Sequence, residues 1–460
     1  MKIRLKSLLL EKVMLVIFIA SILTTLLPSA RAGGSVGIYV DGQYYAPNVT
    51  AQNIARSSGY TSMFLFTLNV ETNGDVTGFG ATLCQNGVYT GDPTWGSKLA
   101  ACKAPPSSVQ RIELCIGSWG SQAFNNIRSL ISSQGTGTNS ILYRHFLALK
   151  NATGADAIQF DDELTYDVNS MVAFGNMLAA IGFKVTLCPY TNQSFWVSVK
   201  NQLGNKVDAI YLQCYDGGAG NDPGNWINAF GGFKVIPGLW GNTETLQSAV
   251  NKMQNWKNAY GIPGGFMWLN GTMQWDYQLW PPGFNLVFEN PAVYWVGSYG
   301  NPGTALQGTN DPYVNSLSQV VTGCNKVAVT PHNSNYQQQW SIYPIGGGKW
   351  RIMNTSSGQL LQATSDPYRN NGGIVASCNK LALTPNTWNV AQSSWQVSTA
   401  SAGGFVFSNP ANSQYIQSTS DNYWSNANNN FVPGCYQSAG TPMSWGVGNQ
   451  TRWNLIFVRP

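Results

Sequence analysis

Short apolar runs alternate with amphipathic stretches from residue 36 to about residue 270. The apolar runs predict buried strands at 36–40, 62–69, 111–116, 156–161, 184–189, 208–214, 233–239 and 264–269. Helical spacing is clearest at 121–133, 140–150, 168–181 and 243–259. In the last of these, one apolar face is formed by Leu246, Val250, Met253 and Trp256. Eight strands with helices between them predict an α/β fold, a (β/α)8 barrel whose chemistry lies at the C-terminal strand ends.

The pattern changes at about residue 291, where helical spacing gives way to a threefold repeat. Copies begin at Leu306, Leu361 and Ile416, lie about 55 residues apart, and each ends in Gln-x-x-Trp. Three short β-rich units predict an all-β trefoil, with the recurrent Trp and Leu/Ile in its core. Each copy also carries Asp-x-Tyr, which could cap a turn or hold a sugar. These candidate lectin residues are Asp311, Tyr313, Asp366, Tyr368, Asp421 and Tyr423.

An acidic run ends the fourth predicted barrel strand, at residues 156–163. Because side chains alternate along a strand, Gln159, Asp161 and Glu163 share one face, and Asp162 points the other way. The chain has only 20 Asp and Glu in 460 residues, so such a run is unusual. A carboxylate beside Glu163 raises its pKa, which suits a general acid near neutral pH.

The first 32 residues have the features of a secretory leader. A basic start, an apolar stretch and Ala30-Arg31-Ala32 before Gly33 predict an exported protein that is soluble after cleavage. The leader holds most of the formal charge of +5, so the remainder is close to neutral. This balance gives no support for binding nucleic acid or an anionic membrane. Abundant Gly, Asn, Ser, Thr and aromatic residues suit an uncharged polar ligand.

The eight cysteines and two histidines bound the chemistry further. Cys84 and Cys102 flank a loop and could pair, while Cys115, Cys188 and Cys214 lie in apolar runs and are expected to be buried thiols. No CxxC or His-x-x-x-His spacing is present. A zinc site, a Cys-His nucleophile and a Ser-His nucleophile are therefore not expected, and no cofactor is predicted.

The acidic run resembles the signature of family-18 glycoside hydrolases, which include chitinases and endo-β-N-acetylglucosaminidases. The family pattern is Asp-Gly-x-Asp-x-Asp-x-Glu; this chain keeps Asp156, Asp161 and Glu163 but has Ala157 and Gln159 at the Gly and the middle Asp. Weaker likenesses follow in order at 114–119, 211–216 and 266–268, so that the resemblance covers roughly residues 34–280.

The resemblance implies retaining, substrate-assisted cleavage in which the 2-acetamido oxygen of the sugar is the nucleophile. Glu163 would be the acid, Asp161 would hold the acetamide N–H, and Tyr215 would donate to the acetamide oxygen. The Gln159 amide is expected to donate to Asp161, with activity reduced rather than abolished. The substrate-binding candidates are Gln159, Trp268, Gln213, Asp216, Trp119, Tyr190 and Trp240.

Residues 291–460 resemble the ricin-type lectin domain, although their common spacing is Gln-x-x-Trp where that family has Gln-x-Trp. The predicted organisation is a leader at 1–32, a hydrolase-like barrel at 33–290 and a carbohydrate-binding trefoil at 291–460. The predicted function is secreted hydrolysis of β-1,4 linkages in N-acetylglucosamine-containing glycans, with an N-acetylated polysaccharide or a glycoprotein glycan as partner. Chitin and the N-glycan core stay open as substrates. The alternative is a lectin-like protein whose barrel binds sugar without cutting it.

Overall fold

The computed structural model of the chain describes residues 33–40, 45, 56–268, 278–370, 373–388, 390–425 and 429–460. The predicted leader lies outside the described residues. Among those that are described, no helix is long and apolar enough to cross a membrane.

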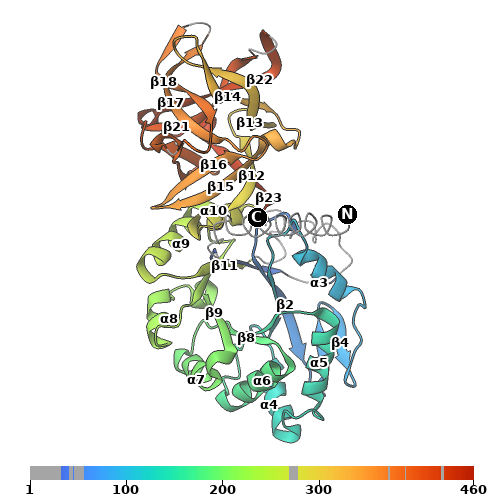
Figure 1. Ribbon diagram of the computed structural model, residues 1–460. Coiled ribbons are helices and arrows are strands. Elements are labelled where there is room, and N and C mark those ends of the chain that lie inside the picture. The colour runs from blue at the N-terminus through green and yellow to red at the C-terminus, as the bar shows by residue number, and fades with distance from the viewer. Residues whose placement is uncertain are drawn as a thin grey trace, which may run out of the picture. The chain divides into compact units, whose positions relative to one another are not determined.

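The first half of the described chain is a closed parallel barrel of eight strands (Figure 1). Their order around the barrel is β1, β11, β10, β9, β8, β7, β6 and β2, and β2 pairs with β1 to close the ring. Their bounds are Ser35–Val40 (β1), Ser62–Val70 (β2), Arg111–Ile116 (β6), Ala157–Phe160 (β7), Lys184–Leu187 (β8), Val207–Gln213 (β9), Ile236–Trp240 (β10) and Gly264–Trp268 (β11). The predicted barrel is confirmed, and its near-continuous strand burial is that of a parallel sheet covered by helices.

Helices surround the barrel strands (Figure 1). They are α3 (Trp95–Lys103), α4 (Ala123–Gln134), α5 (Ile141–Thr153), α6 (Val168–Ile181), α7 (Gln193–Leu203), α8 (Pro223–Ala229), α9 (Leu246–Tyr260) and α10 (Trp280–Val287). Local sequence sets the ends of the clearest ones: Asp167 caps the first turn of α6, and Gly182 ends it with a left-handed φ of 104°. The apolar face predicted for α9 is buried at Leu246 and Met253.

A short antiparallel meander of three strands after β2 was not predicted from the sequence. It consists of β3 (Val76–Gly78), β4 (Ala81–Gln85) and β5 (Val88–Tyr89). The buried His145 of α5 holds it, because Nδ1 lies 2.7 Å from the Gly74 carbonyl and Nε2 accepts the Gly87 N–H at 2.8 Å. This histidine therefore has a structural role.

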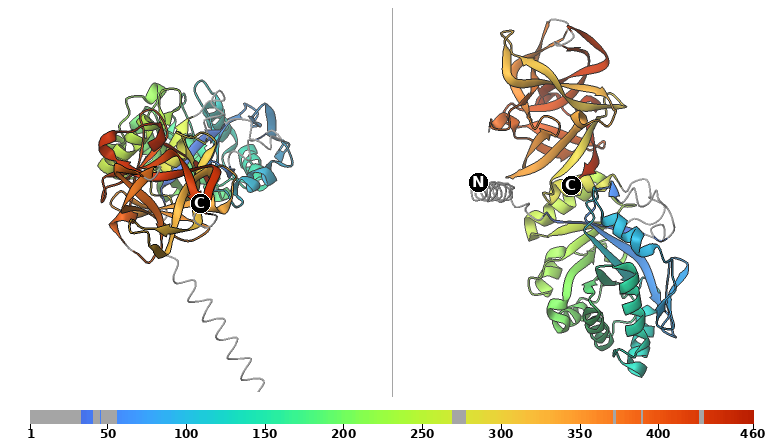
Figure 2. Two further views of the ribbon diagram at one scale, coloured as in Figure 1. Left: turned by 90° about the horizontal axis from the view of Figure 1, so that it is seen from above. Right: turned by 45° about the vertical axis from the view of Figure 1, so that its right-hand side comes forward.

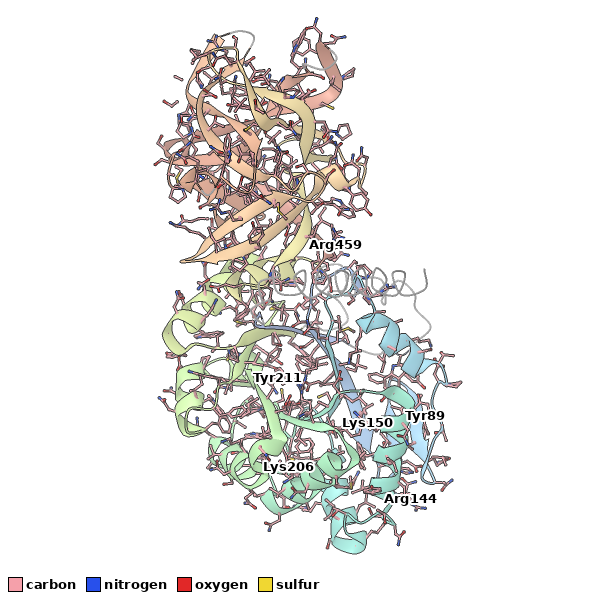
Figure 3. The ribbon with its side chains drawn as sticks, in the orientation of Figure 1. Tyr89, Arg144, Lys150, Lys206, Tyr211 and Arg459 are labelled. Carbon is pink, nitrogen blue, oxygen red and sulfur yellow. The ribbon has the colours of Figure 1, made fainter. Side chains whose placement is uncertain are left out.

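Several polar side chains inside the barrel hydrogen-bond to the buried Glu113. Glu113 on β6 is fully buried and accepts hydrogen bonds from Thr186 (2.5 Å) and from Tyr211 (2.8 Å), with Arg111 as its ion-pair partner. Tyr211, labelled in Figure 3, lies on β9 in the barrel interior. A buried carboxylate persists only with such partners. On β9, Tyr211 precedes Gln213, so this network lies deeper in the barrel than the end of that strand.

The second half is an antiparallel fold of twelve strands, yellow to red in Figure 2. The bounds are Ala292–Ser298 (β12), Thr304–Val314 (β13), Val320–Pro331 (β14), Gln339–Gly346 (β15), Lys349–Asn354 (β16), Leu360–Asn370 (β17), Gly373–Thr384 (β18), Gln396–Thr399 (β19), Phe405–Asn409 (β20), Gln414–Ser425 (β21), Asn430–Pro442 (β22) and Trp453–Arg459 (β23). Three hairpins, β13–β14, β17–β18 and β21–β22, follow the sequence repeat. Strands β14, β18 and β22 pair with one another around a pseudo-threefold axis, which is the predicted trefoil.

The repeated tryptophans are core residues, as predicted. Trp340, Trp395 and Trp453 are fully buried, and the indole N–H of each donates to a main-chain carbonyl of its own repeat at 2.9–3.1 Å. Such a donor bond lets a large ring be buried without an unsatisfied polar atom.

Candidate active site

The C-terminal ends of the barrel strands surround a cavity of about 480 Å³. Eight of the predicted site residues line it, namely Trp119, Asp161, Glu163, Tyr190, Gln213, Tyr215, Asp216 and Trp268. Four lining residues were not among the predicted candidates: Tyr39, Phe66, Ser118 and Gly217. Tyr39 lies near the C-terminal end of β1, and this position is the signal that could have identified it. Phe66 lies within β2, where nothing in the apolar run distinguishes it from a core residue.

Two predicted candidates lie outside the cavity lining. Gln159 is fully buried one layer below, and Trp240 is half-buried against the aromatic cluster inside the barrel. Both lie on the inward face, as alternation requires. Neither side chain lines this cavity.

Asp161 lies at the bottom of the cavity, where it is only 4% exposed. The Gln213 side-chain amide donates to its Oδ1 at 2.9 Å. Burial, together with the charges of Glu163 and Asp162, raises the Asp161 pKa well above its usual range, and the Gln213 hydrogen bond opposes this. Gln213 therefore favours the ionised form of Asp161.

The prediction that the Gln159 amide donates to Asp161 is wrong. Its Oε1 accepts a hydrogen bond from the Tyr39 hydroxyl, and its buried Nε2 has no partner among the described residues. The Tyr39 hydroxyl also lies 3.0 Å from the Cys188 Sγ. The amide that contacts Asp161 belongs to Gln213 at the end of β9, a strand that β8 alone separates from β7.

Glu163 has the electrostatics of a general acid. Burial raises its pKa to about 7, with further contributions from Asp216 and Asp162, and a hydrogen bond from Tyr190 lowers it. A carboxyl group with this pKa is half protonated near neutral pH. General acids work best when their pKa is near the operating pH.

Asp162 supports the loop that carries Glu163. Its carboxylate accepts main-chain N–H groups of residues 164, 165 and 166 at 3.1, 2.8 and 2.8 Å. The side chain does not line the cavity. Alternation predicted this separation of Asp162 from its two neighbours.

Two aromatic side chains form a wall beside the acids. The Tyr215 and Trp268 rings are parallel within 6°, with centroids 6.3 Å apart. Burial raises the Tyr215 pKa well above its usual range, so the hydroxyl keeps its proton as a donor. Trp119 at the cavity edge is 86% exposed, which leaves its ring available to stack on a sugar.

Gly117 is required where β6 passes the acid motif. Its φ is +90°, and a Cβ there would lie 2.4 Å from the Asp161 carbonyl oxygen. Only glycine tolerates both the backbone conformation and the approach. The glycine thereby allows the end of β7 to lie against β6 at the position of Asp161.

The cysteines contribute neither a bridge nor a metal site. Every cysteine is a free, buried thiol, so Cys84 and Cys102 do not pair, and Cys115, Cys188 and Cys214 are buried as predicted. Within the described ranges, no group of three or more His, Cys, Asp or Glu side chains could hold a metal ion.

The six candidate lectin residues form one ring of hydrogen bonds between repeats. Each tyrosine donates to the aspartate of the next repeat: Tyr313 to Asp366 at 2.7 Å, Tyr368 to Asp421, and Tyr423 to Asp311 at 2.6 Å. Each hydroxyl also meets the threonine two residues before that aspartate. The recurrent Asp-x-Tyr therefore joins neighbouring repeats.

Because Tyr368 takes part in this ring of hydrogen bonds, we expect Tyr368→Phe to lower the stability of the protein measurably. Removing one hydroxyl leaves a half-buried carboxylate with one donor fewer, which should lower the free energy of unfolding by about 1.5–3 kcal/mol. Urea unfolding measures this difference. Tyr336→Phe, at a 66% exposed ring, is the matched control and should leave the midpoint unchanged. Equal midpoints for the two variants would contradict a stabilising ring.

No family model matches the sequence, and no curated protein matches it. Among solved structures, a variant GH18 chitinase from Cycas revoluta in complex with (GlcNAc)4 is 13% identical, covers 55% of this chain and 99% of its own, and has a TM-score of 0.41. A protein from Streptomyces coelicolor described as a chitinase A is 16% identical over 55% of this chain and 98% of its own, with a TM-score of 0.40.

A designed protein with threefold symmetry, ThreeFoil, matches another part. It is 12% identical, covers 36% of this chain and 99% of its own, and has a TM-score of 0.26. The strand order and pairing establish the fold of this protein.

Proposed function

We propose that this protein is a glycoside hydrolase that cleaves β-linked N-acetylglucosamine-containing glycans by retaining, substrate-assisted catalysis. The observation that carries the proposal is the pairing of Glu163, whose pKa is raised to about 7, with the buried Asp161 on one sugar-sized cavity. The glycosidic oxygen between two sugars is a poor leaving group until it is protonated, so a carboxylic acid that is protonated near neutral pH is the essential group.

Both carboxyl groups hold a proton more tightly than usual. Burial and the charges of Glu163 and Asp162 raise the Asp161 pKa, and burial and the charges of Asp216 and Asp162 raise the Glu163 pKa. An acetamide N–H donated to Asp161 would stabilise its ionised form beside Gln213. With Asp161 ionised, the proton would be carried by Glu163, which donates it to the leaving oxygen.

The remaining contacts orient the acetamide group. The Tyr215 hydroxyl would donate to the acetamide oxygen and set its approach to the anomeric carbon. Trp268 would support the apolar face of the sugar. Ionised Asp161 would stabilise the positive charge that develops on the acetamide nitrogen, so no protein nucleophile is required.

The charge of Asp216 should influence how the rate of hydrolysis depends on pH, because it contributes to the raised Glu163 pKa. The rate should fall as pH rises through about 7, because Glu163 then loses the proton it must donate. Asp216→Asn removes a like charge and lowers the Glu163 pKa, so the descending limb of the kcat/KM profile should move to lower pH by roughly half a pH unit. Asp75→Asn, on the turn before β3, is the control that should leave the limb in place. A limb that is unmoved in Asp216→Asn would contradict this assignment.

Product analysis tests the proposed function directly. The protein is incubated with N-acetylglucosamine oligomers and, separately, with a high-mannose glycoprotein, and products are followed by mass spectrometry. New reducing ends from either substrate, with the β anomer first by NMR, are expected. Oligomer cleavage indicates a chitinase, and release of the glycan from the protein indicates an endo-β-N-acetylglucosaminidase. Absence of new reducing ends from both substrates would refute hydrolysis.

Gln159 favours a second candidate, a sugar-binding barrel without catalysis. It cannot titrate, and its side chain is directed to Tyr39 rather than to Asp161. In this case N-acetylglucosamine oligomers bind and stay intact, and Glu163→Gln leaves their affinity unchanged. The same product analysis separates the two candidates.

The proposal includes export and a second binding domain. The predicted leader at residues 1–32 would direct secretion, and residues 291–460 would hold the protein to its glycan substrate. Tethering of this kind raises the effective concentration of substrate at the barrel.

A further inference from the structure

A second cavity, of about 250 Å³, lies on the pseudo-threefold axis of the trefoil. Equivalent residues of all three repeats line it, which places it on the axis. We call it the axial pocket, and its walls include Tyr313, Tyr368, Tyr423, Lys326, Lys380 and Gln437. Its volume is below the roughly 300–1,000 Å³ of drug-sized sites, so it suits one small group.

The walls of the axial pocket break the threefold symmetry in a chemically specific way. The residue two positions after the repeated cysteine is Lys326, Lys380 or Gln437. The residue after the repeated tyrosine is Val314, Arg369 or Trp424. Symmetric hairpins therefore present cations in two repeats and an indole in the third.

The two lysines are held in place but keep donors for a ligand. Lys326 Nζ donates to the Trp424 carbonyl at 3.0 Å and lies 5.6 Å from the Tyr423 ring centroid. Lys380 Nζ donates to the Val314 carbonyl at 2.9 Å and lies 5.7 Å from the Tyr313 ring. An ammonium carries three N–H donors, so each has donors beyond this bond.

The nearby carboxylates take part in the ring of hydrogen bonds between repeats and do not line the axial pocket. Asp311, Asp366 and Asp421 accept the tyrosine hydroxyls and are absent from the lining. Burial lowers the pKa of both lysines; the nearest aspartate opposes this, and a neighbouring cation adds to it. A bound anion would offset the cost of that burial and the repulsion between the cations.

An aromatic pair borders the lysines. Trp424 lines the axial pocket and is 38% exposed, and its ring meets Phe431 edge to face at 4.9 Å. An exposed indole beside a cationic pocket provides a stacking surface for a sugar ring.

We propose that the axial pocket binds an acidic saccharide, with its carboxylate or sulfate between Lys326 and Lys380 and its ring against Trp424. This site differs from the barrel cavity in place and in charge. The proposal does not depend on hydrolysis by the barrel.

Calorimetry on the full exported chain tests the site. The probes are a uronic acid oligomer, a sulfated glucosamine oligomer and a neutral N-acetylglucosamine oligomer of the same length. At least one acidic probe should bind, more weakly as salt rises from 50 to 500 mM. Which acidic probe binds identifies the anionic group. If neither acidic probe binds, the proposal is refuted.

Variants locate the binding. Lys326→Gln and Lys380→Gln should each weaken it about tenfold, and the double variant about a hundredfold. Gln437→Lys should tighten it by completing the third cation, which keeps the test valid if the double variant unfolds. Lys349→Gln, at an exposed lysine of the same domain, is the matched control and should change nothing. Equal affinity of the double variant, or neutral-probe binding that depends on these lysines equally, would overturn the assignment.

Discussion

Glu163→Gln should lower kcat on N-acetylglucosamine oligomers by about 10³-fold, the middle of the range for general acid catalysis. Glutamine has nearly the same shape but no proton to give, so KM should change little. The raised pKa of Glu163 is what makes the carboxyl a donor near neutral pH. Steady-state kinetics on a soluble oligomer measure the loss.

The leaving group distinguishes an acid from a residue that only shapes the cavity. An aryl glycoside with an acidic phenol needs little protonation, so Glu163→Gln should lose much less activity on it than on the oligomer. Glu71→Gln, at an exposed glutamate beyond the cavity, is the matched control for charge removal and should keep full activity on both. An equal loss on both substrates for Glu163→Gln would rule out the acid role.

Asp161→Asn should lower kcat by about 10²–10³-fold, the loss seen when one group that stabilises transition-state charge is removed. The side chain keeps its shape and its contact with Gln213, but the buried negative charge is lost. That charge is needed only when the acetamide nitrogen becomes positive, so kcat should fall with KM nearly unchanged. Kinetics on the oligomer supply both parameters.

Asp156→Asn is the matched control at the other end of the same segment. Asp156 pairs with Lys103 at 2.7 Å, so this change should affect stability and leave kcat intact. A cationic mimic of the cyclised acetamide should bind wild type more tightly than Asp161→Asn, while the neutral oligomer should bind both alike. An oligomer that loses as much affinity as the cation would show that Asp161 only shapes the ground-state site.

Local patterns were sufficient for the architecture. Apolar runs placed all eight barrel strands within a few residues, because a strand buried on both faces is apolar along most of its length. The meander β3–β5 was missed because its three strands have only two to five residues each and show little alternation of apolar and polar side chains. It is held by His145 from a helix far along the chain, which no local pattern reports.

By itself, the sequence determined which side chains share a face. Alternation along one strand separated Asp161 and Glu163 from Asp162, and the repeat identified Asp-x-Tyr as a unit. Alternation is a property of a single chain segment, so it can be read without the fold.

Only the tertiary structure decided which residues meet. It gave Asp161 the amide of Gln213, gave Gln159 the hydroxyl of Tyr39, and joined each tyrosine to the aspartate of the next repeat. It also brought Lys326 and Lys380 to one axis. These contacts depend on the stagger of neighbouring strands and on ring closure, which are set by packing of the whole domain and leave no mark at the residues themselves.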